Sequence, residues 1–255
     1  MKTLLKYDFS YLWKTSKVIV LVGLGLFLAG LGVVTARFLP DIYRFAFGDS
    51  DIIITLPDPT IMDAYEQFFS NFTEMFVIVL IFLMVAFFTR DETGGHAPLI
   101  FSKPLRRRHY VLSKSLWMSV SVVGTLVVSA LFFMYYTALL FDGLDVLRFV
   151  FSVFTLAVFI IMLMHMALFF TVWTKTYLAP VGMTFLVFVL VFSLLNMLQV
   201  GVFRFFPNHL MRYPLLFLQG EVSSGTVWIT IAISVLISAA LLYATVTRFE
   251  RKELA

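Results

Sequence analysis

The residues best suited to specific contacts lie in one short stretch, "RDETGGHAPLIFSKPLRRRHYVLSK", from Arg90 to Lys114. Eight of these 25 residues are charged, whereas 13% of the whole chain is charged. Such side chains can form ion pairs and charge-assisted hydrogen bonds. The apolar residues beside them can fill a cleft on another protein, and they would otherwise form an exposed apolar patch in water. The pattern favours docking of a partner over catalysis.

Elsewhere the chain lacks the motifs of catalysis. It has no cysteine, and it contains no GxxxxGK[ST] phosphate loop, no HExxH and no GxSxG. Its four histidines are spread along the chain, which disfavours a shared metal site. We therefore expect no catalytic residues, no metal and no cofactor bound by this chain, and we expect no nucleic-acid partner.

The elements that must position this stretch are membrane spans. The chain is 61% hydrophobic, and crossing about 30 Å of hydrocarbon takes roughly 20 apolar residues. The sequence predicts an all-α integral membrane protein with one domain, 1–255, and six transmembrane helices, at 18–38, 72–89, 115–141, 149–173, 176–203 and 226–247.

The basic residues predict the orientation of these spans. With both termini in the cytoplasm, 14 of the 19 Lys and Arg residues fall on the inner side. This asymmetry is the positive-inside signal, and it indicates a multi-pass membrane protein with residues 90–114 in the cytoplasm. We expect it in the bacterial plasma membrane. Burying the eight charges of that stretch would cost on the order of 20 kcal/mol, so it is a solvated loop.

The segments outside the spans have characters of their own. Residues 1–17 are basic and amphipathic at helical period, which favours a helix lying in the inner membrane interface. A signal peptide is the alternative, but the apolar run that follows is longer than a typical signal sequence. Residues 39–74 are an acidic outer loop, 204–225 an outer or re-entrant segment, and 248–255 a cytoplasmic tail.

A few polar residues fall within the spans. Tyr135, His165, Asn196 and Gln199 are candidates for lining a substrate path, because polar groups at membrane depth usually face the bundle interior. The alternative is hydrogen bonding between helices. The first span also has small residues four apart, Gly25 with Ala29 and Gly32 with Ala36, a spacing that lets helices approach closely.

The stretch from 90 to 114 resembles the first cytoplasmic loop of type-2 ABC exporter permeases, in which an acidic residue and a glycine precede a short coupling helix. The six-span topology is also similar, whereas the apolar "HAPLIFS" departs from the usual polar helix. The resemblance implies that these residues contact the ATPase: Asp91, Glu92, Gly94, Leu99, Ile100, Phe101, Pro104, Leu105 and Arg106.

The resemblance implies an exporter of an amphipathic or hydrophobic substrate, with a peptide favoured, similar to small permeases of peptide-toxin export or antimicrobial-peptide immunity. It implies two copies of an ABC ATPase subunit that carry ATP and Mg, a second permease that is identical or paralogous, and contact with membrane lipid. The alternative is a membrane scaffold or sensor that docks a soluble cytoplasmic partner without transport. An ion-coupled transporter would need buried carboxylates in broken spans, and the sequence predicts none.

Overall fold

The computed structural model describes residues 2–47, 58–93, 106–174, 176–192 and 201–251. These ranges form helices and turns without a β-strand. Five helical stretches are long and apolar enough to cross a membrane: Lys17–Leu39, Ile61–Asp91, Arg107–Leu140, Val146–Trp173 and Ser224–Arg251. The all-helical, multi-pass membrane fold that the sequence predicts is therefore confirmed.

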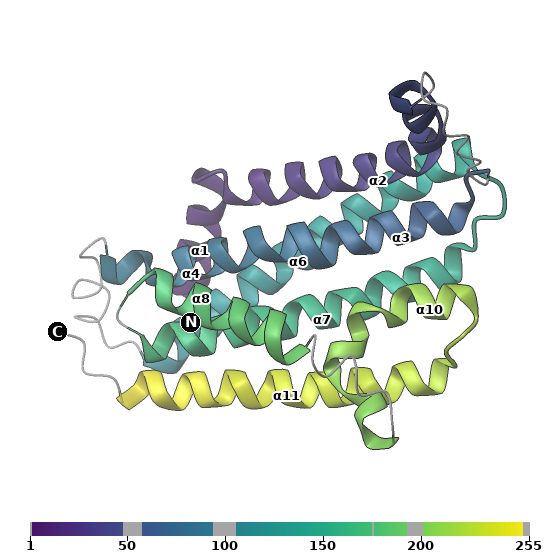
Figure 1. Cartoon of the computed structure of the whole chain (residues 1–255). Helices are drawn as coiled ribbons and strands as arrows, with labels where there is room; N and C mark the ends of the chain where they lie inside the picture. Colours follow the sequence, from purple (N-terminus) through teal and green to yellow (C-terminus); the bar gives the residue numbers. More distant parts are fainter. Residues whose placement is uncertain (1, 48–57, 94–105, 175, 193–200, 252–255) are drawn as a thin grey trace.

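The long helices run side by side, and α7 (Val146–Trp173) and α11 (Ser224–Arg251) run in the same direction, toward the end of the bundle where the chain finishes (Figure 1). Helix α1 (Lys2–Lys14) lies at the end of the bundle where α11 finishes. We call this the α1 end. The other long helices are α2 (Lys17–Phe47), α4 (Val77–Thr93) and α6 (Arg107–Leu140).

The predicted fifth span, 176–203, differs from the others. Its described part is α8 (Leu178–Leu186) followed by the π-helical η2 (Val187–Val191). The chain then continues through the 3-10 helices η3 (Gly201–Phe205) and η4 (Pro207–Met211) to α10 (Tyr213–Gln219), near the far end of the bundle (Figure 1). These pieces connect the end of α7 to the start of α11, so five spans are long helices and the sixth crossing stays a prediction.

The second span begins earlier than the sequence indicates. Residues expected in the outer loop form α3 (Ile61–Asn71), which runs on through the π-helical η1 (Phe72–Phe76) into α4. The carboxylate of Asp63 starts this helix by accepting a hydrogen bond from the backbone N–H of Thr60, at 2.7 Å. This capping contact satisfies an N–H that would otherwise lack a partner.

Aromatic rings fill the core between α3, α6 and α7. Phe68 lies 4.6 Å from Phe133 and 5.4 Å from Phe149, measured between ring centroids, and Tyr65 stacks on Phe149 at 5.4 Å. All four side chains are fully buried. Many of the chain's phenylalanines therefore hold helices together, and aromatic pairs of this geometry add to the gain from burial alone.

Small residues let α2 approach its neighbours. A methyl group at Gly25 would collide with Thr125 and Ser129 of α6, and one at Gly32 would lie 3.3 Å from the backbone nitrogen of Phe68 in α3. The close approach that the small-residue spacing indicates is present on two sides of α2.

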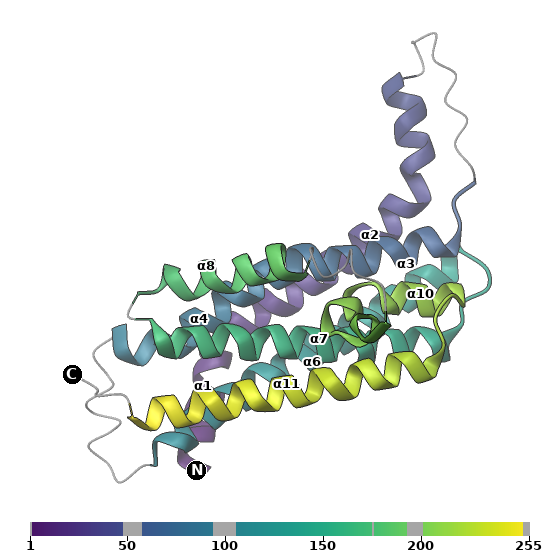
Figure 2. The same cartoon turned by 60° about the horizontal axis from the view of Figure 1, so that its bottom comes forward.

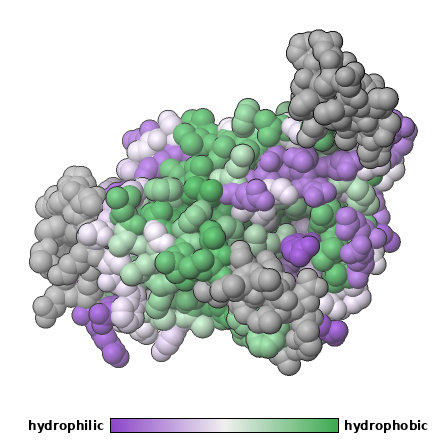
Figure 3. All heavy atoms as spheres, viewed as in Figure 1, coloured by the Kyte–Doolittle hydropathy of each residue, from purple (hydrophilic) through white to green (hydrophobic). Residues whose placement is uncertain are grey.

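A sharp corner joins α1 to α2. Ser16 has a positive φ of 56°, and the Thr15 hydroxyl donates to the carbonyl of Tyr11 at 2.7 Å. The corner turns α1 across the end of the bundle, while the far end of α2 projects away from it (Figure 2). Hydrophobic residues dominate the middle of the face drawn in Figure 3, and hydrophilic residues gather toward the end where α3 begins.

Candidate functional site

A buried group of charged residues joins α1, α4 and α6 at the α1 end. We call it the ion-pair cluster: Asp8 of α1, Arg90 and Asp91 of α4, and Lys114 of α6. The two acidic and two basic side chains balance in charge. Arg90 and Asp91 precede residues 94–105 in the chain and Lys114 follows them, so the cluster includes both flanks of the charged stretch.

The ion pairs are short. Arg90 bridges the two acids, with 2.8 Å from its Nη2 to Oδ1 of Asp8 and 2.9 Å from its Nε to Oδ1 of Asp91. The Nζ of Lys114 lies 2.9 Å from Oδ2 of Asp91 and 3.8 Å from Oδ1 of Asp8. Each base contacts both acids. The pairs therefore join α1 to α4, α4 to α6 and α1 to α6.

Neutral groups complete the coordination. The Ser113 hydroxyl donates to Oδ2 of Asp8 at 2.6 Å, and the Tyr110 hydroxyl donates to Oδ2 of Asp91 at 2.8 Å. Lys114 also donates to the carbonyl of Phe87 at 2.9 Å. Such hydrogen bonds are needed because attraction between buried charges offsets their desolvation only when the remaining polar groups are satisfied.

Aromatic rings enclose the cations. The Arg90 guanidinium lies 3.6 Å from the centroid of Tyr11, and the Lys114 ammonium lies 4.4 Å from that of Phe87. The ring faces attract cations, and they exclude water from the pairs. Lys114 has no exposed surface and Asp8 has 1%, so both are removed from solvent.

Burial raises the pKa of Asp8, while Lys114, the Ser113 hydroxyl and Arg90 act in the opposite direction. Desolvation is thus the largest effect on this carboxyl, even with two cations beside it. A shift of α1 would leave a buried charge without its partner. Asp8 is therefore suited to holding α1 in one position relative to α4 and α6.

The same end of the bundle also holds α11. The ring of Tyr110 stacks on Phe249 at 5.4 Å with an interplanar angle of 9°, and Phe88 meets Phe249 edge-on at 5.7 Å. Arg107 donates to the backbone carbonyl of Glu250 at 3.2 Å. The helices that flank the loop are therefore packed against the last helix as well as against α1.

The sequence singled out part of this site. Asp91 belongs to the cluster, and Arg106 is exposed at the start of α6. Glu92 lies in the last turn of α4, but its side chain lies outside the part that the structure describes. The remaining predicted contact residues also lie outside the described residues: Gly94, Leu99, Ile100, Phe101, Pro104 and Leu105.

Sequence reasoning did not place Asp8 or Lys114 in the site. Asp8 is the first acidic residue of the chain, and the next, Asp41, comes after the first span. One acid among the lysines of an amphipathic helix was the signal available, since an isolated carboxylate next to an apolar face needs a buried partner. The sequence predicts that Lys114 ends a solvated loop, whereas it is a buried helical residue.

The structure describes two of the four residues that the sequence proposes for a substrate path, His165 and Tyr135. His165 is buried in α7, and its ring nitrogens hydrogen bond with the Ser115 hydroxyl at 2.7 Å and the Ser238 hydroxyl at 2.5 Å. The ring thus ties α6, α7 and α11 together, the arrangement expected of hydrogen bonding between helices. Tyr135 is 62% exposed on α6, and Asn196 and Gln199 lie outside the described residues.

The side chains of the ion-pair cluster contact one another across three helices. Within the described part of the chain, no three His, Cys, Asp or Glu side chains gather as a metal site would require. The acids of the cluster are each held by two cations and a hydroxyl, so what the site can do is fix helices relative to one another.

Comparison with known proteins shows similarity to a distant relative. The chain is 27% identical over 165 residues to an uncharacterized transmembrane protein, YxlG, of Bacillus subtilis (strain 168). The match covers 63% of this chain and 63% of the length of that relative. No protein-family model matches the chain. The similarity agrees with a transmembrane protein, and the description of the relative names no activity.

Proposed function

We propose that this chain is the membrane-spanning permease subunit of an ATP-driven ABC exporter, which moves an amphipathic or hydrophobic substrate outward, with a peptide favoured. The assembly would contain a second permease and two ATPase subunits, which bind the ATP and Mg. Both termini and the 90–114 stretch would face the cytoplasm, where the ATPase binds.

One observation carries this proposal: the two flanks of the charged loop are joined by the buried pair between Asp91 and Lys114, at 2.9 Å. A subunit without its own ATPase must receive motion from a partner and pass it to its spans as a rigid body. Because Asp91 ends one span and Lys114 lies near the start of the next, a displacement of the loop would move α4 and α6 together.

The other contacts of the ion-pair cluster extend this unit. Asp8 attaches α1 through Arg90, and Tyr110 packs on Phe249 of α11. Elements from both ends of the sequence would follow the motion of the loop. A scaffold that only docks a soluble protein has no need for such a connection, which is why the exporter is favoured over this alternative.

The deciding experiment is purification of the tagged chain from its native membrane, followed by identification of the proteins that come with it. We expect a P-loop ATPase in a ratio near one to one. The variant Leu99→Asp places a charge in the apolar part of the loop and should release the ATPase. Leu147→Asp is a matched control, because Leu147 is 82% exposed at the opposite end of the bundle.

If the chain purifies without an ATPase, or if both variants retain it equally, the exporter assignment fails and the scaffold or sensor becomes the better account. If an ATPase is retained, Glu92→Ala should lower its substrate-stimulated activity without releasing it, which would separate coupling from docking.

A further inference from the structure

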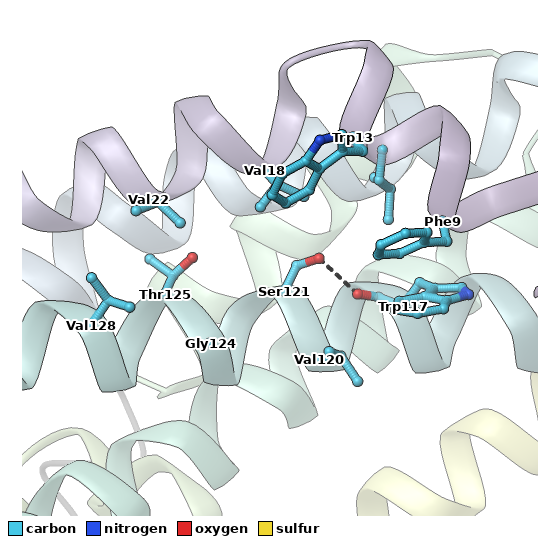
Figure 4. A pocket seen from close by; sticks show the side chains of 11 residues that line it. Phe9, Trp13, Val18, Val22, Trp117, Val120, Ser121, Gly124, Thr125 and Val128 are labelled. Atoms are coloured by element: carbon cyan, nitrogen blue, oxygen red, sulfur yellow. Dashed lines mark hydrogen bonds between the residues drawn. The ribbon is translucent and has the colours of Figure 1, made fainter. Parts of the chain in front are cut away.

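A second feature of the α1 end is a groove between α1, the start of α2 and α6. Its volume is about 270 Å³, and nearly all of its lining is apolar. We call it the α1–α6 groove. Figure 4 shows Phe9 and Trp13 of α1 and Trp117 of α6 at one end of it, with Val128 at the other.

The groove has the length of a lipid chain in one leaflet. From Trp117 to Val128 is eleven residues of α6, and at 1.5 Å per residue this is about 16 Å. A hydrocarbon core about 30 Å thick gives each leaflet about 15 Å. The floor has no side chain at Gly124, where a methyl group would meet nothing within 4 Å.

Two polar groups of the lining have partners within the chain. The Ser121 hydroxyl donates to the backbone carbonyl of Trp117 at 2.8 Å (Figure 4), and the Trp117 indole donates to the carbonyl of Leu5 at 2.9 Å. The second bond also fixes Trp117 against α1. Trp13 is 64% exposed at the aromatic end of the groove, and indole side chains are favoured at membrane surfaces.

Lysines surround that aromatic end. Lys6 is on the same helical face of α1 as Phe9 and Trp13, three and seven residues away, while Lys14 and Lys17 lie on either side of the corner into α2. None of the three forms an ion pair within the described part of the chain, although Lys17 lies 5.2 Å from the ring of Tyr11.

The one acidic residue of α1 does not neutralise these lysines. Asp8 on α1 is 1% exposed and is already paired with Arg90, and α6 carries no acidic residue along its whole length. The groove is apolar, has the length of one leaflet and lies next to a helix whose lysines form no ion pair with the described residues. Such a site is complementary to a molecule with an anionic head and a long alkyl chain.

We propose that the α1–α6 groove binds one acyl chain of an anionic phospholipid from the leaflet on the α1 side, with its phosphate near Lys6, Lys14 and Lys17. Juxtamembrane lysines attract anionic lipid surfaces. The groove adds a cavity for the acyl chain of the lipid, which a flat lipid-facing helix lacks. Such a lipid would hold α1 against α6 from the membrane side, opposite the ion-pair cluster. The proposal does not depend on the exporter assignment.

The test uses the full chain with Trp173→Phe and Trp228→Phe, so that Trp13 and Trp117 alone report. The protein is placed in phosphatidylcholine vesicles that contain either dibrominated phosphatidylglycerol or dibrominated phosphatidylcholine, whose bromines quench nearby tryptophans. We expect half-maximal quenching at about a fivefold lower fraction of the anionic lipid, the preference that one engaged lysine gives.

Two kinds of variant test the contribution of the lipid headgroup and that of the acyl chain separately. Replacing the three lysines by glutamine should bring the ratio between the two lipids to one, whereas Arg108→Gln, an exposed cation on α6, should leave it unchanged. Gly124→Leu fills the groove and should reduce quenching by the anionic lipid several-fold. Gly182→Leu is its matched control, because Gly182 also has open space around it.

A ratio of one in the parent protein would overturn the proposal. An unchanged ratio between the two lipids in Gly124→Leu would also overturn the proposal. Lysines at the surface would then account for the preference for the anionic lipid without an acyl chain in the groove. If neither lipid quenches until the protein is strongly diluted in lipid, a second copy of the chain covers the groove and the proposal fails.

Discussion

Removal of the Lys114 charge is the most informative perturbation of the ion-pair cluster. Lys114→Met keeps a long, flexible side chain but removes the ammonium that lies 2.9 Å from Asp91 and 3.8 Å from Asp8. Two buried carboxylates would then share one cation, Arg90. The Phe87 carbonyl would also lose the hydrogen bond that Lys114 donates at 2.9 Å.

The magnitude follows from burial. Breaking a buried ion pair by removing one partner costs about 3–5 kcal/mol, because the remaining charge is left uncompensated. For a chain of this length each kcal/mol lowers Tm by about 2–4 °C, so the expected fall is about 6–20 °C. The double variant Asp91→Asn with Lys114→Met leaves Asp8 with Arg90, one charge of each sign, and should recover more than half of the loss.

The measurement is thermal unfolding of the purified chain in detergent, followed by tryptophan fluorescence. Lys6→Met is the matched control, because Lys6 is exposed on α1 and forms no ion pair with the described residues. Equal Tm values for the Lys6 and Lys114 variants would refute the reasoning. A double variant less stable than Lys114→Met would do the same, since it would show that charge balance is not what stabilises the site.

Three further predictions concern other parts of the bundle. Gly25→Ala should cost about 1–3 kcal/mol in unfolding measurements, because its methyl group meets Thr125 and Ser129, whereas Gly23→Ala, which has open space, should be neutral. His165→Leu should cost about 1–3 kcal/mol by leaving the Ser115 and Ser238 hydroxyls without their ring partner, and the triple variant that also makes both serines alanine should recover part of it. Burial, followed by Arg212, lowers the pKa of His209 against a hydrogen bond with the backbone of Phe203. The stability that His209 contributes is therefore present above its unfolded pKa of about 6.5 and is lost as pH falls below it. Hydrogen exchange in η4 and α10 should accelerate between pH 7.5 and 5 after intrinsic correction, and His209→Gln should remove most of this dependence.

The sequence predicted the parts of the fold that depend on hydrophobicity. Long uncharged runs give membrane helices whatever they pack against, so α2, α6, α7 and α11 fall close to the expected spans. The sequence places the start of the second span too late, because Tyr65, Phe68 and Phe69 are buried in α3 although acidic residues lie close to them in the sequence. Counting charges assigned Asp63 and Glu66 to a loop, whereas they lie on the exposed face of a helix.

The ion-pair cluster could be predicted only in part, for a different reason. Asp8 and Arg90 are 82 positions apart, and Asp8 and Ser113 are 105 apart. Periodicity places Asp8 among the lysines of α1 but does not say which helix crosses it. The same uncertainty holds for His165, whose partners Ser115 and Ser238 come from two other spans. Pairings of this kind follow from how helices pack, which one sequence alone does not contain.

The ion-pair cluster consists of charged residues at a place where apolar residues would also pack. This composition supports a role beyond stability. Buried ion pairs are often no more stabilising than well-packed apolar residues of similar volume, so stability alone gives little reason to place four charges there. What they add is register, because Arg90 reaches both carboxylates only when α1 lies in one position across α4. Apolar packing tolerates a helix that slides, whereas a buried carboxylate that loses its cation does not. A subunit that transmits the motion of a docked partner needs α1, α4 and α6 to move without sliding, and the ion-pair cluster supplies that constraint where the loop joins the bundle.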